Sequence, residues 1–176
     1  MTELIRTKLN LRVKSKSFKG YTDCIDDLLH NEITDSMTSF VQHGSVTCFD
    51  HSLSVSYYSY MLCRFLRLDF RSAARGGLLH DLFLYSWHKS KLIGGKHTFT
   101  HPYTALENAN KHFLLNKKEK DIIVKHMWPL TIRFPRYKEA YVVSFVDKYC
   151  AFLEVAKFCK IKMFAYSNSN SSFSGI

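Results

Sequence analysis

Apolar residues recur at helical spacing along most of the chain, and this periodicity restricts the fold class more than any other feature. The first such stretch covers residues 22–42 and carries Ile25, Leu28, Leu29, Ile33 and Met37. Stretches of the same period cover residues 51–67, 69–83, 117–127 and 137–159. No convincing alternation of apolar and polar residues, the pattern of a half-buried strand, appears between them. The sequence therefore predicts an all-α fold, a single helical bundle with about six main helices.

Polar residues that favour helix starts stand at the predicted boundaries. Asp50 is expected to cap the second helix and Asp69 the third. Thr100 is expected to cap the fourth helix, with Pro102 in the first turn, where the missing N–H costs nothing. Asn116 separates that helix from the fifth. These positions divide the periodic stretches into separate helices.

The length of 176 residues gives room for one domain with a core and little room for two. Residues 1–20 are basic and weakly patterned, and we expect a loose N-terminal arm there. Residues 161–176 are polar and of low complexity, which predicts a disordered tail. The folded domain is expected over residues 21–160. No signal-peptide core follows the N-terminus, and no apolar run is long enough to span a bilayer, so we expect a cytoplasmic protein that does not enter a membrane.

The five cysteines form no CxxC pair, which argues against a disulfide framework and against a thiolate zinc site. The formal net charge of +10 would attract an anionic ligand such as a phosphate ester. Non-specific binding to nucleic acid is an alternative. Because the charges are dispersed over the chain, specific nucleic-acid binding ranks below a small anionic substrate.

Histidines and aspartates stand where a helix should be apolar. His51 begins the second helix, His80 and Asp81 end an otherwise apolar one, and Asp147 interrupts an apolar segment of the last. A carboxylate in such a place is costly to bury unless it is paired or bound to a cation. Each residue alone is weak evidence, since a single buried histidine is usually a satisfied core residue and Asp147 could pair with Lys148.

The order of these residues resembles the HD superfamily of metal-dependent phosphohydrolases: a histidine, a His-Asp pair 29 residues later, and an aspartate late in a long helix. The landmarks are Asp50-His51-Ser52-Leu53, Gly77-Leu78-Leu79-His80-Asp81 and Phe145-Val146-Asp147-Lys148, and the resemblance covers residues 40–155. The His-Asp pair alone occurs often by chance, whereas the helix-placed quartet is far more specific. The resemblance implies an HD domain in which His51, His80, Asp81 and Asp147 bind a metal ion.

Two further histidines lie between the pair and the last aspartate, His101 at the start of the fourth helix and His126 at the end of the fifth. HD proteins with this layout tend to bind two metals. The segment 100–105 resembles the helix start of the bacterial HD-type hydrolases of diadenosine tetraphosphate and, more loosely, of the HD-GYP phosphodiesterases. The resemblance implies that Asp81 bridges to a second metal held by His101 and His126. The alternative is that these two are only a cap and a helix-end residue.

The chain departs from the HD-GYP pattern at three places. Leu84 stands where those proteins usually carry a lysine, His126-Met127 replaces their paired histidines, and no Gly-Tyr-Pro triplet follows. Cleavage of cyclic di-GMP is therefore not supported. The layout is closer to the dinucleotide polyphosphate hydrolases, but it does not fix the substrate.

Imidazoles and carboxylates suit divalent Fe, Mn, Zn, Ni or Co. The resemblance implies two such ions and a metal-activated hydroxide that attacks a nucleotide-like phosphate ester, with Asp81 as the catalytic residue that orients the nucleophile. The reaction would be that of a phosphomonoesterase or of a phosphodiesterase or pyrophosphohydrolase. Cations near the landmarks are candidates for substrate binding, although each could be an ordinary loop residue: His88, Lys96, Lys125, Arg133 and Lys148.

Two other functions remain open at this point. One is a mononuclear phosphatase for nucleoside monophosphates, which would use only the first four ligands. The other is a non-catalytic HD-like module for signalling, although such modules generally lack the metal ligands that this chain keeps. The sequence also leaves homo-oligomerisation open.

Overall fold

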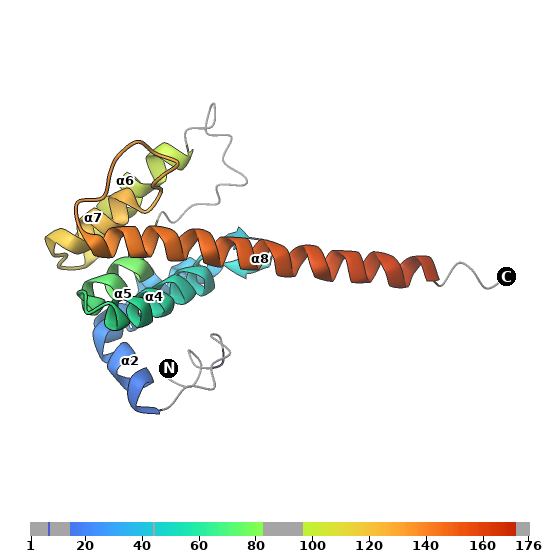
Figure 1. Cartoon of the computed structure of the whole chain (residues 1–176), viewed down its shortest axis with the longest axis horizontal. Coiled ribbons are helices and arrows are strands. Elements are labelled where there is room, and N and C mark those ends of the chain that lie inside the picture. Colours follow the sequence, from blue (N-terminus) through green and yellow to red (C-terminus); the bar gives the residue numbers. More distant parts are fainter. Residues whose placement is uncertain (1–6, 8–14, 44, 83–96, 172–176) are drawn as a thin grey trace.

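The computed structural model of the chain describes residues 7, 15–43, 45–82 and 97–171, and within them the side chains of residues 7, 18–42, 45–82 and 100–157. These residues are mostly helical, with seven α-helices, α2 to α8, and one small sheet (Figure 1). The all-α prediction is confirmed. Among the described helices, none is both long and apolar enough to cross a membrane.

The first predicted helix, over residues 22–42, is instead several elements: α2 (Ser15–Leu29), α3 (Glu32–Asp35), the 3-10 helix η1 (Ser36–Ser39) and the strand β1 (Val41–His43). Helix α2 begins inside the stretch predicted as a loose arm. The chain restarts as α3 because the Asn31 side chain accepts a hydrogen bond from the Ile33 amide. Strand β1 pairs antiparallel with β2 (Val46–Thr47), a hairpin too short for alternation to reveal.

Helices α4 (Cys48–Phe65) and α5 (Phe70–Leu79) form the central pair. The Thr47 hydroxyl accepts a hydrogen bond from the Asp50 amide and caps α4, so the prediction that Asp50 is the cap was wrong. Asp69 caps α5 as predicted, by accepting the Ser72 amide at 3.0 Å. Helix α5 ends with His80 at its C-cap, a few residues short of the predicted end.

Helices α6 (His97–His112) and α7 (Lys117–Lys125) follow. Helix α6 begins three residues before Thr100, so Pro102 lies inside the helix, and the predicted cap and first-turn proline were wrong. The apolar pattern is weak at this start, and the prediction relied on the residue types alone. Asn116 begins α7 as predicted, in a capping box whose other partner is Glu119.

Helix α8 (Lys138–Ser171) spans the bundle and runs beyond it (Figure 1). It begins near the predicted residue but continues twelve residues past the predicted end. Residues 161–171, which belong to the stretch predicted as a disordered tail, form the last turns of α8, and residues 172–176 lie outside the described residues. An existing helix can extend at little cost because each added residue needs no new nucleation.

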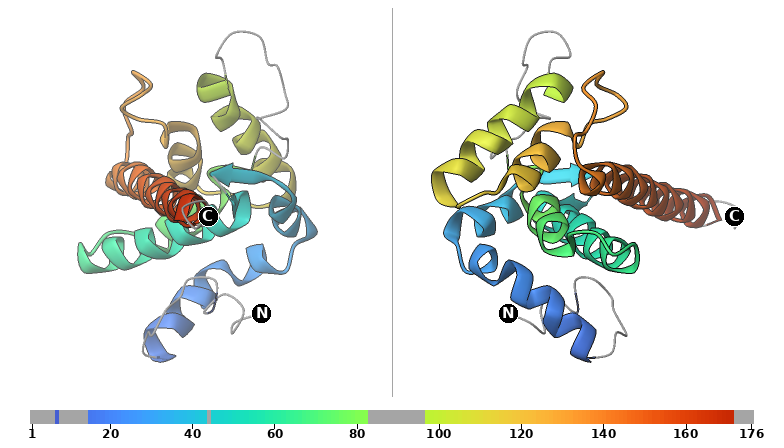
Figure 2. Two further views of the ribbon diagram at one scale, coloured as in Figure 1. Left: turned by 90° about the vertical axis from the view of Figure 1, so that its right-hand side faces the viewer. Right: turned by 60° about the vertical axis from the view of Figure 1, so that its left-hand side comes forward.

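The helices pack in layers around α4 and α5. Helix α2 covers one side of this pair, α7 and α8 cover the other, and α6 lies outermost against α7 (Figure 2). Two apolar clusters fill the layers: one includes Tyr21, Leu53 and Leu78, and the other includes Val55 and Val146. The second cluster lies between α4, α5, α7 and α8, the helices that hold most of the predicted site.

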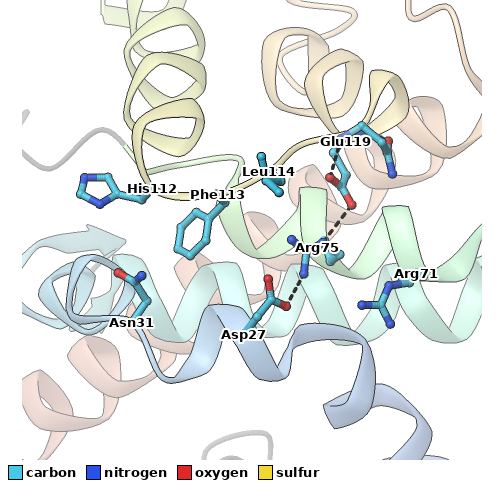
Figure 3. Close-up of a pocket in the computed structure, with 9 residues that line it drawn as sticks. Asp27, Asn31, Arg71, Arg75, His112, Phe113, Leu114 and Glu119 are labelled. Atoms are coloured by element: carbon cyan, nitrogen blue, oxygen red, sulfur yellow. Dashed lines mark hydrogen bonds and ion pairs between the residues drawn. The ribbon is translucent and has the colours of Figure 1, made fainter.

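A polar pocket of about 460 Å³ lies between the C-terminal part of α2, the first half of α5 and the start of α7 (Figure 3). Its central group is the buried guanidinium of Arg75, which pairs with Asp27 of α2 and lies 2.9 Å from Glu119 of α7. Two carboxylates already neutralise this arginine, so it offers little free charge to a ligand. We therefore interpret the ion pairs of Arg75 as a structural link between α2, α5 and α7.

Candidate metal centre

The six residues predicted as metal ligands meet in one buried cluster. They come from α4, the end of α5, α6, the end of α7 and α8, in the order His51, His80, Asp81, His101, His126 and Asp147. Their donor atoms form three overlapping groups that could hold a metal ion, and within each group all donors lie within 4.8 Å of one another. The topology thus brings together every predicted ligand.

The first part of the cluster gathers around one oxygen of Asp147. Its Oδ1 lies 3.0 Å from Nε2 of His51 and 3.6 Å from Nε2 of His80. The same His80 nitrogen lies 3.3 Å from Oδ2 of Asp81. Two imidazoles and two carboxylates therefore face a common point.

The second part gathers around the other oxygen of Asp81. Its Oδ1 lies 3.4 Å from Nε2 of His101 and 3.5 Å from Nε2 of His126. These two nitrogens are 2.9 Å apart. Asp81 therefore turns one oxygen toward each part of the cluster, as a carboxylate that bridges two metal ions does.

Backbone carbonyls fix the orientation of two of these imidazoles. Nδ1 of His80 lies 2.8 Å from the Gly77 carbonyl, and Nδ1 of His126 lies 2.8 Å from the Ile123 carbonyl. Both histidines are C-cap residues, and the last carbonyls of a helix have no partner inside it. A carbonyl only accepts, so Nδ1 donates, and whenever the ring is neutral the lone pair of Nε2 faces the cluster, the form in which histidine binds a metal.

The histidines of the cluster carry opposite pKa shifts. Burial would lower the pKa of His51, but hydrogen bonds to Asp147 and Glu154 raise it to about 9. Burial would also lower the pKa of His80, but the charge of Asp81 and a hydrogen bond to Asp147 raise it to about 10. Burial and the neighbouring charge of His80 lower the pKa of His126 to about 3.

The two aspartates stay ionised. Burial alone would raise the pKa of Asp81 and of Asp147, yet the imidazoles around them hold both pKa values well below the ordinary range. The two buried carboxylates therefore need nearby positive charge. Protonated imidazoles supply it here, and a bound metal cation would supply it equally.

Two buried polar atoms in the cluster lack a well-formed hydrogen bond among the described residues: Nε2 of His80 and Oδ1 of Asp81. Such atoms are costly to bury without a partner. One lies in each part of the cluster, and both are of a type that binds divalent transition metals. The residues present therefore fit the ions that the resemblance implies.

Sequence reasoning missed two residues that support the ligands. Both carboxylate oxygens of Glu154 lie within 3.1 Å of Nδ1 of His51. Glu154 follows Asp147 by seven residues, two helical turns, and this spacing could have indicated it. Gln42 donates to Oδ2 of Asp81 at 2.5 Å. It lies on β1, a strand that was not predicted, so no pattern in the sequence indicated its role.

The predicted substrate-binding residues differ in where they lie. Nζ of Lys148 lies 3.1 Å from Oδ2 of Asp147 and donates to the carbonyl of His126, so this cation borders the cluster. Lys125 pairs with a carboxylate of its own helix. Arg133 donates to the Tyr103 hydroxyl and covers its ring. The described contacts of these last two lie outside the cluster.

Two further predicted substrate-binding residues, His88 and Lys96, lie outside the described residues. Comparisons of the chain with protein-family models, with curated proteins and with solved structures found no match. Any assignment of function therefore depends on the residues of the cluster and on their geometry.

Proposed function

We propose that the chain is a metal-dependent phosphohydrolase of the HD type that acts on a small, nucleotide-like phosphate ester. The observation that carries this proposal is the position of Asp81, whose two oxygens face two sets of buried ligands. The net charge of +10 supports an anionic substrate. Nucleotides are abundant in the cytoplasm, which is the location that we propose.

Each set of ligands would hold one divalent ion. His51, His80, Asp147 and Oδ2 of Asp81 would hold the first, and Oδ1 of Asp81, His101 and His126 the second. The donor types suit Fe, Mn, Zn, Ni or Co. When bound, such ions lower the pKa of water toward neutrality and offset negative charge on a phosphoryl group.

The remaining work falls to side chains of the chain itself. Asp81 is ionised and buried, so it can orient an attacking water by accepting a hydrogen bond. The Lys148 ammonium at the border of the cluster can bind phosphate oxygens. The burial of the histidines limits the access of bulk water, which strengthens each of these interactions.

The test is a hydrolysis screen on purified protein loaded in turn with Mn, Fe, Zn, Ni and Co. The substrates are nucleoside monophosphates, diadenosine tetraphosphate, p-nitrophenyl phosphate and its bis ester. We expect metal-dependent release of phosphate or nucleotide, and a loss of at least about 100-fold in Asp81→Asn. The matched control is Asp26→Asn on the surface of α2, which should keep full activity. Metal-loaded protein that cleaves none of these substrates would contradict the proposal.

A mononuclear phosphatase for nucleoside monophosphates is the second candidate. The observation that favours it is the distance of 2.9 Å between Nε2 of His101 and Nε2 of His126. At that distance one imidazole can donate to the other, so this pair can be satisfied without a second ion. The number of ions bound per chain separates the two candidates.

A further inference from the structure

One face of α8 carries a row of exposed apolar side chains. The exposed fractions are 36% for Tyr141, 66% for Phe145, 51% for Tyr149, 69% for Phe152 and 47% for Val155. The spacing of three and four residues places them on one side of the helix. We call these five residues the α8 stripe. It lies opposite the side of α8 that buries the core.

A second row lies on the neighbouring helix α4. Tyr58, Met61 and Phe65 are 41%, 38% and 81% exposed and share one face of that helix. Helices α4 and α8 pack side by side, and Tyr58 is close enough to Cys150 and Tyr149 of α8 for both to add to the rise that burial causes in its pKa, so Tyr58 borders the α8 stripe. The stripe and these three residues together form what we call the apolar face.

The size of the apolar face is unusual for a surface that stays in water. An aromatic side chain has roughly 200 Å² of surface, so the exposed fractions leave about 750 Å² of apolar area over the eight residues. Monomeric proteins seldom expose a contiguous apolar patch of more than about 300–600 Å². The face is therefore expected to be covered.

We propose that a second copy of the chain covers the apolar face, so that α8 of one protomer packs against α8 of the other in a two-fold symmetric dimer. Two such faces would bury about 1,500 Å² in total, close to the roughly 1,600 Å² of a standard stable interface. A two-fold axis brings identical patches together, and a straight helical row suits pairing with its own copy. Figure 1 shows that α8 runs past the end of the bundle.

The chemistry of the face favours protein over lipid or nucleic acid. Tyrosine and phenylalanine are enriched at the centres of protein interfaces, where charged residues are depleted. Lys148 is the one charged side chain between Tyr141 and Phe152 on this side of α8, and its ammonium turns to Asp147, Ser144 and the His126 carbonyl. The five residues of the stripe carry no charge, and the ammonium beside them turns toward the candidate metal centre, so the outward surface of the stripe offers little positive charge to an anionic headgroup or a phosphate backbone.

The test is the molar mass of the full chain by light scattering coupled to size exclusion, loaded at about 1 to 100 µM. We expect twice the chain mass of 20.6 kDa for the wild type. Phe145→Glu combined with Phe152→Glu should give the monomer, because two carboxylates would be buried in the interface. The matched control is Leu114→Glu, which changes an apolar residue that is 97% exposed away from the face and should stay dimeric.

Circular dichroism then confirms that each variant is folded. If the double variant loses its helical spectrum, the milder Phe145→Ala and Phe152→Ala should each weaken the dimer at least about tenfold. A wild type that is monomeric throughout the range would overturn the proposal, as would a dimer that none of these variants weakens. A monomer that floats with anionic phosphatidylglycerol vesicles would also overturn it and would assign the face to a membrane surface.

Discussion

At the scale of single residues, the centre depends on which nitrogen each histidine turns inward. Backbone carbonyls determine this for His80 and His126, and a carboxylate, Glu154, does so for His51. A carboxylate behind a ligating histidine fixes the tautomer and raises the basicity of the ligand. Because Glu154 lies on the same helix as Asp147, one element would supply both a ligand and a support.

Glu154→Gln should therefore weaken metal binding without removing a ligand. The amide keeps an acceptor oxygen but loses the negative charge behind His51, and we expect the metal affinity of the first set to fall about 10-fold or more. Competition with a fluorescent chelator measures this affinity. Glu107→Gln, which changes an exposed glutamate of α6, is the control and should bind like the wild type. Equal affinities in all three proteins would show that Glu154 plays no supporting role.

At the scale of elements, the approach of α5 to its neighbours positions the His-Asp pair. A Cβ atom on Gly77 would lie 3.0 Å from the Cα and 3.2 Å from the amide nitrogen of Ser56, both backbone atoms of α4. Backbone atoms at a helix crossing cannot rotate away as a side chain can. Glycine at this position therefore lets α5 approach α4 closely, three residues before His80.

The sign of one stability change tests this close approach. Helix propensity alone would make Gly77→Ala stabilising by about 1 kcal/mol. We expect the contact with Ser56 to outweigh this gain and to lower the free energy of unfolding by about 1–3 kcal/mol. Urea unfolding measures the difference. The control Asn110→Ala on the exposed side of α6 should show the propensity gain alone, and a stabilised Gly77→Ala would be inconsistent with the tight crossing.

The ion pairs of Arg75 also hold α5 against its neighbours, α2 and α7. Arg75→Met removes one partner of a buried pair and leaves Glu119, which is 2% exposed, without its cation. We expect a loss of about 3 kcal/mol or more in the free energy of unfolding. Arg71→Met, one turn earlier and exposed, should change it by less than about 0.5 kcal/mol. Similar small effects of both substitutions would mean that the link is not important for stability.

A second ion-pair network joins α5, α7 and α8 and gives a dependence on pH. Nζ of Lys118 lies 3.2 Å from Asp69 and 2.9 Å from Glu139. Burial raises the pKa of both carboxyl groups, but hydrogen bonds, including those from Lys118, outweigh it and lower both pKa values. Their contribution is therefore complete above the ordinary carboxyl pKa of about 4 and is lost as the pH falls through the lowered values.

Lys118→Met should consequently destabilise the protein at neutral pH and hardly at all in acid. We expect a loss of about 1 kcal/mol at pH 7, since the lysine is partly exposed. The difference from the wild type should shrink as the pH falls through the lowered pKa values, because below them the carboxyl groups are protonated in both states. Urea unfolding across this range measures it. A difference that stays constant with pH would attribute the effect to packing rather than to charge.

At the scale of the whole molecule, the sequence predicted what local chemistry determines. The caps Asp69 and Asn116 set the starts of α5 and α7, and the six polar residues on apolar helices proved to be neighbours. The β1–β2 hairpin was missed because two or three residues show no periodicity. The support from Gln42 could not be predicted either, since it depends on that hairpin reaching a residue 39 positions away.

The topology of the chain creates the centre. His51 and Asp147 are 96 residues apart, yet their side chains lie 3.0 Å from each other because α4 and α8 pack side by side. Five elements must be in place before the ligands meet. We propose that this convergence holds two metal ions rather than a network of hydrogen bonds.

The most direct test of this claim is the metal content per chain, measured by elemental analysis of protein purified without chelators. We expect about two equivalents in the wild type and about one in folded His101→Ala and His126→Ala. One equivalent that these substitutions leave unchanged would contradict the second site, and no bound metal even after reconstitution would contradict the centre as a whole.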